Sequence, residues 1–473
     1  REKLDSKEIS AIDLTQYYLN RIKKIDPKIN SYITVCEEEA LEMAKRAQKK
    51  IDEKKASILT GIPLSIKDNI CTKGIITTCA SRMLENFNPP YNATVVTKLM
   101  SEDAVILGKV NMDEFAMGSS TQSSFFKKTK NPYDLNRVPG GSSGGSAASV
   151  SSGLAAASLG SDTGGSIRQP AAFCGLTGIK PTYGTVSRHG LIAFASSFDQ
   201  IGPLAKSARD CALILEVIAG KDNYDSTSKE VHIDFASKIG QSIKGLKIGI
   251  PAEYFDEGLE GEVKRAVIET LSNIKSMGAE VIDVSMPSLK YAVAAYYLIS
   301  SAEAVANLAR YDGIRFGYCV QEAEGYEERI KKTRKEGFGE EVKRRILLGN
   351  YALSSGYYDQ YYKKALTVMQ RIKREYEEIF KKCDAIITPT MPSVANKIGE
   401  NENDPIKIYL CDIYTVPVNI AGLPALNTTC GYDKNGMPIG LSIVGKKFDD
   451  ATVLQVADAI EKNFKVQYPA ISG

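Results

Sequence analysis

Two glycine-rich turns, each containing serine, are the most distinctive chemical feature of the sequence. The first spans residues 140–146 (GGSSGGS) and the second spans residues 161–166 (SDTGGS). Paired glycines let backbone amides crowd around a bound group, because no Cβ blocks the approach. Such turns can hold a phosphate or the oxyanion of an acyl-transfer intermediate. The phosphate alternative is weaker, because neither turn matches G-x-x-x-x-G-K-[ST] or a strand-led G-x-G-x-x-G followed by an acidic residue.

Ser166 is the candidate nucleophile of the second turn. It precedes an expected helix at residues 167–174, where backbone N–H groups and the helix dipole favour negative charge. The amides of Thr163, Gly164 and Gly165 can then stabilise the oxyanion that forms when a serine attacks a carbonyl. The competing interpretation is that Ser166 only caps its helix, and spacing alone favours capping.

A serine nucleophile needs a base, and histidine is scarce in this chain. There are two, and His232, in VHID, is expected at the surface, so a Ser-His-Asp triad would depend on His189 alone. A His-rich metal site is excluded. Lys67 is an alternative base: it follows the apolar stretch GIPLSI and can act if desolvation lowers the pKa of its amine by several units. For a lone lysine, the competing interpretation is an ordinary ion pair at a strand end.

Alternating amphipathic and short apolar segments indicate the elements that position these residues. In the first half we expect helices over residues 6–54, interrupted by an extended piece at 32–35, then a strand at 64–67, a helix at 93–101 and a strand at 104–109. The Gly/Ser/Ala-rich stretch 140–190 interleaves apolar runs and helix starts, so we interpret it as folded and not as a linker.

The second half contains a β-α-β pattern. We expect strands at 246–250 and 280–284 around a helix at 260–277, a helix of about seven turns at 357–382, a strand at 385–389, a hairpin turn at 433–436 and a final helix at 451–464. Helices that alternate with short buried strands predict an α/β fold.

Composition restricts the class further. The 473 residues carry a net charge of only +3, which gives no electrostatic footprint for nucleic acid by itself. The nine cysteines form no C-x-x-C pair, so neither a disulfide framework nor a thiolate zinc site is indicated. No transmembrane run or signal segment is apparent, and a cytoplasmic location is expected. Because the chain begins at Arg1, we expect a short N-terminal piece to precede it.

The central motifs resemble those of the amidase signature family. GGSSGGS and SDTGGSIRQPAAFCGLTGIKPT match the family's signature sequence, and PLSIKDN matches the block that carries its catalytic lysine. The resemblance implies that Ser166 is the nucleophile, Ser142 the bridging serine and Lys67 the base. It also implies a cis peptide bond between Gly141 and Ser142, and amide hydrolysis through an acyl-enzyme without a metal or organic cofactor.

The resemblance also implies the fold, because our assignment of elements does not give the strand order. We expect one large amidase domain over residues 1–473, with a mixed twisted β-sheet flanked by helices on both faces. Residues 60–210 would form the core that carries the triad, and residues 245–465 would form the remainder of the sheet and the amide-substrate pocket.

Outside the core, the chain most resembles the glutamine-hydrolysing subunits of tRNA-dependent amidotransferases. The supporting stretches are FAMGSSTQSSFFKKTKNPYDLNRVPGGSSGGS, YGTVSRHGLIAFASSFDQIGPL, EVKRRILLGNYALSSGYYDQYYKKA and TVPVNIAGLPALN. This resemblance places Arg345 on the α-carboxylate of glutamine and Asp412 on its α-ammonium, with Tyr296 lining the pocket. From sequence alone, Arg345 would be a solvated helix charge and Tyr296 a core aromatic, whereas an acid among the apolar neighbours of Asp412 needs a partner.

A chain of this kind implies two partners, the amidotransferase subunits B and C. The first would bind charged tRNA and, with ATP and Mg²⁺, convert Glu-tRNA(Gln) to Gln-tRNA(Gln) with the ammonia released here, while the second, a small protein, would tether the pair. Three alternatives remain. A stand-alone amidase for small amides would differ at Arg345 and Asp412. A non-catalytic scaffold protein is disfavoured by the intact set of Lys67, Ser142 and Ser166, and a nucleotide-binding protein by the missing Walker lysine.

Overall fold

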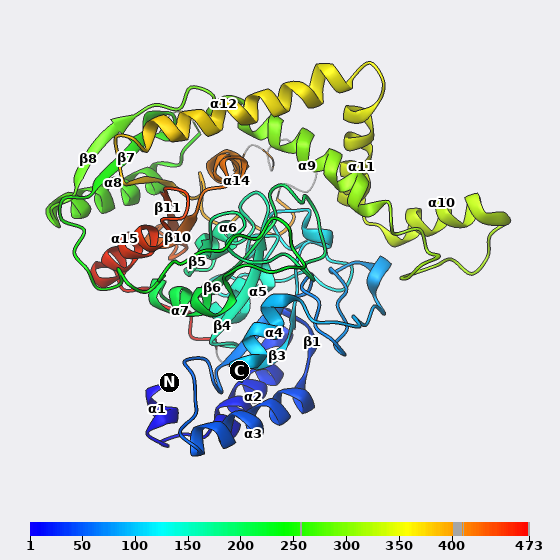
Figure 1. The fold of residues 1–473 in the computed structure, drawn as a ribbon, viewed down its shortest axis with the longest axis horizontal. Helices are drawn as coiled ribbons and strands as arrows, with labels where there is room; N and C mark the ends of the chain where they lie inside the picture. The colour runs from blue at the N-terminus through cyan, green and yellow to red at the C-terminus, as the bar shows by residue number, and fades with distance from the viewer. Residues whose placement is uncertain (256–257, 401–408, 410, 472–473) are drawn as a thin grey trace.

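The computed structural model describes residues 1–255, 258–400, 409 and 411–471, and the strands among them form one open sheet (Figure 1). The strand order is β1-β3-β2-β4-β6-β5-β10-β11-β9-β7-β8. The strands are β1 (Tyr32–Val35), β2 (Pro63–Lys67), β3 (Val105–Val110), β4 (Ala157–Asp162), β5 (Thr177–Lys180), β6 (Gln200–Ala205), β7 (Lys247–Pro251), β8 (Glu280–Val284), β9 (Ala385–Pro389), β10 (Ala425–Tyr432) and β11 (Pro438–Gly445).

The sheet is mixed, as expected. β2 runs parallel to β3 and β4, and β7 runs parallel to β8 and β9, while the pairs from β4 through β6, β5, β10 and β11 to β9 are antiparallel. The strands of residues 60–210 thus lie together and meet those of residues 245–465 where β5 pairs with β10.

Helices cover both faces of the sheet, which confirms the predicted α/β class. Thr177 of β5 hydrogen-bonds through its hydroxyl to Glu461 on one face, and a Cβ on the next residue, Gly178, would meet Ala171 on the other. The helices are α1 (Glu2–Asp5), α2 (Ala11–Ile29), α3 (Glu37–Asp52), α4 (Thr94–Ser101), α5 (Gly144–Ser151), α6 (Arg168–Phe173), α7 (Ala208–Ile218), α8 (Gly261–Ser276), α9 (Ala292–Leu308), α10 (Gly325–Gly337), α11 (Glu340–Leu353), α12 (Lys363–Ile379), α14 (Val416–Ala421) and α15 (Asp450–Asn463).

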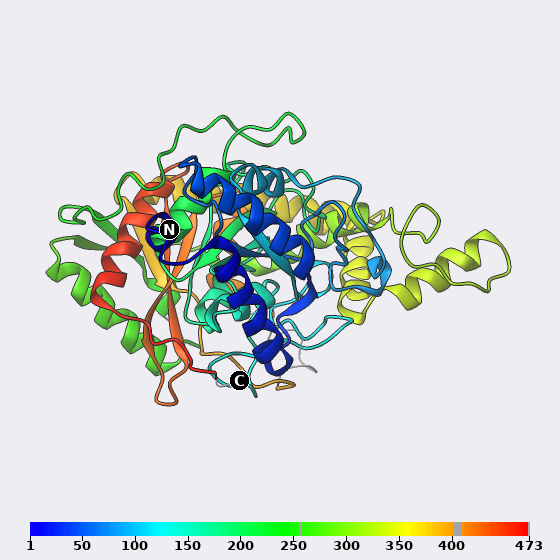
Figure 2. The same ribbon diagram turned by 90° about the horizontal axis from the view of Figure 1, so that it is seen from below.

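A second layer of helices lies beyond α6. α9 packs against α11, α12 and α14, and these helices share a hydrophobic core that includes Tyr296, Tyr297 and Val342. α10 extends away from the body of the molecule, in yellow-green in Figures 1 and 2. This second layer leaves α11 as one wall of the region above the glycine-rich turns.

Most expected elements are present within one to three residues of their expected ends, including the β7–α8–β8 unit. The hairpin turn is confirmed, because the Asp433 amide donates to the Met437 carbonyl at 2.9 Å and Gly436 has φ +79°. Among the described residues, no helix is long and apolar enough to cross a bilayer.

Two expected helices are wrong in part. Residues 6–10 are not helical: Lys7 has φ +59°, and the Ser10 hydroxyl accepts a hydrogen bond from the Asp13 amide at the start of α2. The helix expected over 357–382 is α-helical only over α12, after a π-helical turn at Tyr358–Tyr362. The rings of Tyr351 and Tyr357 pack there with their centroids 4.4 Å apart, a tertiary contact that helical periodicity does not reveal.

Candidate active site

Lys67 lies at the end of β2 with a fully buried side chain that is surrounded by serine oxygens. Its Nζ is 2.7 Å from Ser142 Oγ, 2.8 Å from Ser143 Oγ and 2.9 Å from Ser161 Oγ. Among the described residues, no carboxylate forms an ion pair with Lys67; the neighbouring Asp68 pairs with Lys109. The interpretation of Lys67 as an ordinary strand-end ion pair is therefore wrong.

Burial lowers the pKa of Lys67 to about 7. The negative charges of Asp113, Asp162 and Asp199 oppose this shift only in part. A large fraction of the amine is therefore neutral at physiological pH, as a general base requires.

The hydrogen bonds around neutral Lys67 occupy both of its N–H donors, so its lone pair can accept a proton from Ser142. A neutral amine has two N–H donors and one lone pair. Ser143 donates its own proton to the Ser161 carbonyl at 3.1 Å, so its Oγ accepts from Lys67. Ser161 Oγ accepts from Asn69 Nδ2 at 3.0 Å and offers the second acceptor for Lys67. The Ser142 hydroxyl can then donate its proton to the amine.

The two glycine-rich turns lie side by side. The Gly141–Ser142 peptide bond is cis, as the family resemblance implied. The Ser143 amide donates to the Ser166 carbonyl at 3.2 Å, which joins the turns directly. Ser142 is fully buried beside Lys67, whereas Ser166 is 8% exposed and faces a cavity.

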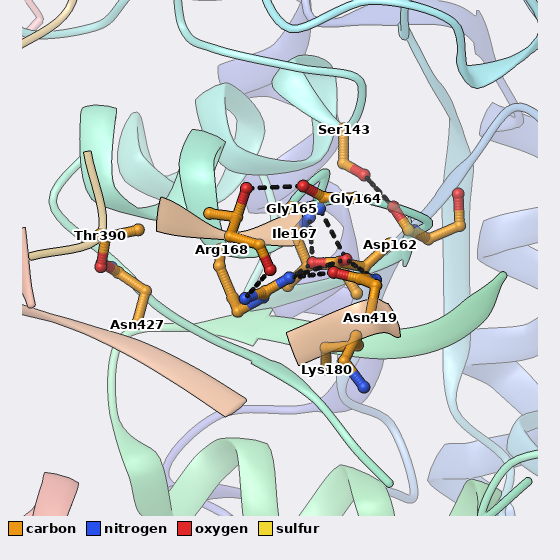
Figure 3. Close-up of polar contacts among 12 residues, drawn as sticks. Ser143, Asp162, Gly164, Gly165, Ile167, Arg168, Lys180, Thr390, Asn419 and Asn427 are labelled. Atoms are coloured by element: carbon orange, nitrogen blue, oxygen red, sulfur yellow. Dashed lines mark hydrogen bonds and ion pairs between the residues drawn. The ribbon is translucent and has the colours of Figure 1, made fainter. Parts of the chain in front are cut away.

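Ser166 does not cap a helix. α6 begins at Arg168 after Ile167, and no side chain caps it. The anion at this helix start is Asp162, whose carboxylate accepts hydrogen bonds from the Gly165 and Ile167 amides at 2.8 and 3.1 Å (Figure 3). The Ser166 hydroxyl is thus not required for capping.

The same contacts correct one part of the expected oxyanion site. Because the Gly165 amide already donates to Asp162, it is not free to donate to an oxyanion. The amides of Thr163 and Gly164 remain as candidates. Gly164 lines the cavity, and a Cβ there would lie 2.6 Å from the Tyr296 hydroxyl oxygen, so this position requires glycine.

A cavity of about 430 Å³ lies above Ser166. Its walls come from the segment 113–123, from the second glycine-rich turn, and from α9, α11 and the 3₁₀ helix Cys411–Tyr414. Tyr296, Arg345 and Asp412 all line it. The fold thus brings the three expected substrate-binding residues to the same cavity as the expected nucleophile.

Arg345 is buried, with 3% of its surface exposed, so its interpretation as a solvated helix charge is wrong. Its Nε donates to Glu341 Oε1 at 2.7 Å, and its guanidinium carbon lies 4.4 and 4.9 Å from the ring centroids of Tyr297 and Tyr409. These contacts fix a planar cation in the cavity wall, where it can bind a carboxylate.

Asp412 supplies a group of the opposite charge in the same cavity. It accepts a hydrogen bond from the Tyr297 hydroxyl at 2.5 Å, and desolvation raises the pKa of its carboxyl to about 7. A ligand cation next to Asp412 would favour its ionised form. Tyr296, 4% exposed, packs between this pair and the second turn.

Sequence reasoning missed three residues that hold the charged pair. They are Tyr297, Glu341 and Tyr409; the Tyr409 hydroxyl donates to the same Glu341 oxygen as Arg345, at 2.7 Å. The sequence contained a signal for Glu341, because an acidic residue four positions before Arg345 lies on the same helix face and can pair with it. Nothing in the sequence placed Tyr409 there.

The histidines lie outside this cavity. The side chain of His232 is 90% exposed, which confirms its surface position, and His189 stacks between Tyr91 and Tyr224. Within the described part of the chain, no group of three or more His, Cys, Asp or Glu side chains is arranged to hold a metal ion. Ser166 lines the cavity, and the side chain of Lys67 is fully buried.

Comparison with known proteins defines the class that this fold and this serine–lysine arrangement represent. Residues 13–454 match the family model described as Amidase, and the chain belongs to that family. A solved peptide amidase from Stenotrophomonas maltophilia is 26% identical, with a TM-score of 0.82 and coverage of 99% of this chain and 97% of that chain.

More similar proteins share one name within the family. The A subunit of glutamyl-tRNA(Gln) amidotransferase from Ruminiclostridium cellulolyticum is 58% identical over 100% of this chain and 98% of its own length. The corresponding protein of Thermoanaerobacter pseudethanolicus is 57% identical over 100% and 97%. The crystal structure of the same protein from Thermotoga maritima is 43% identical, with a TM-score of 0.81 and coverage of 98% of this chain and 95% of that chain.

Proposed function

We propose that this chain is the glutamine-hydrolysing subunit of a tRNA-dependent amidotransferase. One observation carries the proposal: Ser166, Arg345 and Asp412 line one cavity, while Ser142 of the first glycine-rich turn is buried next to Lys67. The names of relatives at 57–58% identity support the same function.

In the proposed mechanism, neutral Lys67 accepts a proton from Ser142, and Ser142 accepts one from Ser166 as the Ser166 oxygen attacks the amide carbon of glutamine. The amides of Thr163 and Gly164 stabilise the oxyanion. The proton then returns along the same route to the leaving nitrogen, and ammonia departs. Water attacks the acyl-enzyme by the same route, which releases glutamate and regenerates Ser166.

The cavity suits a zwitterionic substrate. Free glutamine carries one α-carboxylate and one α-ammonium, and Arg345 and Asp412 supply one opposite charge for each. A small neutral amide offers no charge to either group, so Arg345 would keep only its contacts within the protein, including Glu341, and Asp412 would keep the Tyr297 hydroxyl. The charge-assisted contacts that glutamine can make would then be missing. The charged pair therefore favours glutamine over the alternative of a stand-alone amidase for small neutral amides.

The remaining steps belong to partner chains. We propose a second protein that binds charged tRNA and uses ATP and Mg²⁺ to activate Glu-tRNA(Gln), a small third protein that tethers the pair, and a cytoplasmic location for the complex. In this proposal the present chain uses no cofactor of its own, and the ammonia it releases converts Glu-tRNA(Gln) to Gln-tRNA(Gln). The names of its relatives, which are those of one part of an amidotransferase, support assembly into such a complex.

The first test measures ammonia release from glutamine by the wild type, Ser166→Ala and Arg345→Ala, each with and without the two partner proteins. We expect Ser166→Ala to lower kcat by about 10³-fold or more. Arg345→Ala should lower kcat/KM for glutamine by about 10- to 100-fold, because a charged hydrogen-bond partner is lost, and should spare propionamide.

Two results would contradict the proposal. A complex that cleaves propionamide and ignores glutamine would be an amidase of another specificity. A Ser166→Ala variant with wild-type rates would exclude the serine mechanism and leave the scaffold alternative.

A further inference from the structure

Glu114 is a buried carboxylate in the cavity wall with no role in the mechanism described above. It lies in the 3₁₀ turn Glu114–Ala116, directly after the Asp113 that receives the Ser120 and Thr121 amides, and it is 3% exposed. Its Oε2 accepts a hydrogen bond from the Gly339 amide at 2.8 Å, and its Oε1 accepts one from the Ser81 hydroxyl at 2.5 Å. Glu114 thus contacts a segment more than 200 residues away in the chain.

Gly339 is the N-cap residue that directly precedes α11. A carboxylate that accepts an amide at the N-terminus of a helix satisfies an otherwise unpaired donor and interacts favourably with the helix dipole. The approach is close, since a Cβ on Gly339 would lie 2.3 Å from Glu114 Oε2. Ser81 Oγ also lies 3.2 Å from the Gly337 carbonyl oxygen, so its single proton lies between this oxygen and the closer Glu114 Oε1. Ser81 and Glu114 thus contact the joint between α10 and α11 on both sides.

Arg345, which lines the cavity, lies in the first two turns of α11. Arg345 lies six residues after Gly339, and its own partner Glu341 lies two residues after Gly339. A displacement of the helix start therefore moves Arg345 relative to Ser166, which lines the same cavity from a different segment.

We propose that Glu114 is a positioning residue that fixes α11, through the Gly339 amide, so that Arg345 meets the α-carboxylate of the amide substrate. This inference rests on the proposed glutamine specificity. It assigns Glu114 to binding of the substrate's charged end and not to the proton transfers at Ser166. Its removal should therefore affect substrates that carry a carboxylate and spare those that do not.

The test compares glutamine with propionamide, which has neither an α-carboxylate nor an α-ammonium, in the complex with both partner proteins. The assay is run at pH 8.5, because burial raises the pKa of Glu114 to about 7 and the charged form is the one that holds the helix. We expect Glu114→Ala to raise KM for glutamine at least tenfold with kcat changed less than twofold. kcat/KM for propionamide should also change less than twofold.

Two milder variants and one control complete the design. Glu114→Gln keeps an acceptor for the Gly339 amide and should raise KM for glutamine only two- to fivefold, and Ser81→Ala should do the same. If Glu114→Ala does not fold, the KM values of these two variants decide whether the inference holds. Glu336→Gln is the matched control: this carboxylate near the same joint contacts Tyr318 and Arg82 at the surface, and its KM should match the wild type.

The outcomes separate this inference from the proposed function. A wild-type complex that ignores glutamine overturns the proposed function and this inference with it. A wild type that uses glutamine, with Glu114 variants of unchanged KM, overturns this inference alone. Equal losses on glutamine and propionamide would assign Glu114 a general structural role and overturn it as well.

Discussion

At the level of single residues, the environment of Lys67 controls whether this lysine can act as the base that we propose for Ser166. The amine is buried among the oxygens of Ser142, Ser143 and Ser161, and burial lowers its pKa to about 7. Because the pKa is lowered, the neutral form that acts as a base is populated as pH rises through 7. The rate of glutamine hydrolysis should therefore increase with the fraction of Lys67 that is neutral.

The pH profile tests this role. We expect kcat at saturating glutamine, where the α-ammonium of the substrate keeps Asp412 ionised, to rise about tenfold per pH unit below pH 7 and to level off above it. Lys67→Arg places a group there that stays protonated at every accessible pH, so its activity should fall by at least about 10³-fold across the range. Lys67 would be excluded as the base if the rate began to fall only near pH 4, or if the Lys67→Arg enzyme were active.

At the scale of elements, Asp162 connects the end of β4 to the start of α6 and so shapes the turn that holds Ser166. Its carboxylate accepts from the Gly165 and Ile167 amides, from Arg168 Nε at 3.1 Å and from Asn419 Nδ2 at 2.8 Å (Figure 3). Burial alone would raise the pKa of Asp162, but the Arg168 guanidinium and these hydrogen bonds hold it well below its usual range. The charged form is thus stable throughout the physiological range.

Removing this carboxylate should destabilise the fold. Asp162→Ala leaves the Arg168 guanidinium buried beside unpaired amides, and we expect the free energy of unfolding in urea to fall by about 3–5 kcal/mol. Asp210→Ala, at the exposed start of α7, is the control and should cost about 1 kcal/mol or less. Because the pKa of Asp162 is depressed, its contribution should persist above the unfolded-state value and disappear only as pH falls through the folded one. Equal losses for the two variants would contradict this account.

At the scale of the whole molecule, the continuous sheet makes the chain one folding unit. β10 pairs with β5 through Ala425, Leu426 and Asn427, all buried, and the side-chain Nδ2 of Asn427 donates to the Leu176 carbonyl at 2.8 Å. Separating residues 245–473 from the first half would therefore expose an apolar strand with unpaired backbone groups.

A fragment of residues 245–473 should not fold alone. We expect it to lack native near-UV circular dichroism and a cooperative urea transition, and to gain both when it is co-expressed with residues 1–244. A cooperative transition in the isolated fragment would show that the second half is an independent domain.

Motifs within the sequence predict the catalytic groups, and apolar spacing predicts most local elements. Lys67, Ser142 and Ser166 lie within contiguous motifs, and helix and strand types follow from apolar spacing over a few residues. The sequence could not exclude helix capping by Ser166 or an ion pair at Lys67, because both depend on which distant groups lie nearby.

The strand order, the burial of Arg345 and the arrangement of the cavity follow from long-range packing and became visible only in the folded structure. Ser166, Arg345 and Asp412 lie on three segments separated by more than sixty residues each, and only sheet pairing and the packing of α9, α11 and α14 bring them together. Two hydrogen bonds were likewise visible only in the folded structure: the Gly165 amide donates to Asp162, and the Gly339 amide donates to Glu114. The physical reason is that these contacts join groups whose separation in the chain carries no local pattern, whereas a turn or an amphipathic helix is specified by its own neighbours.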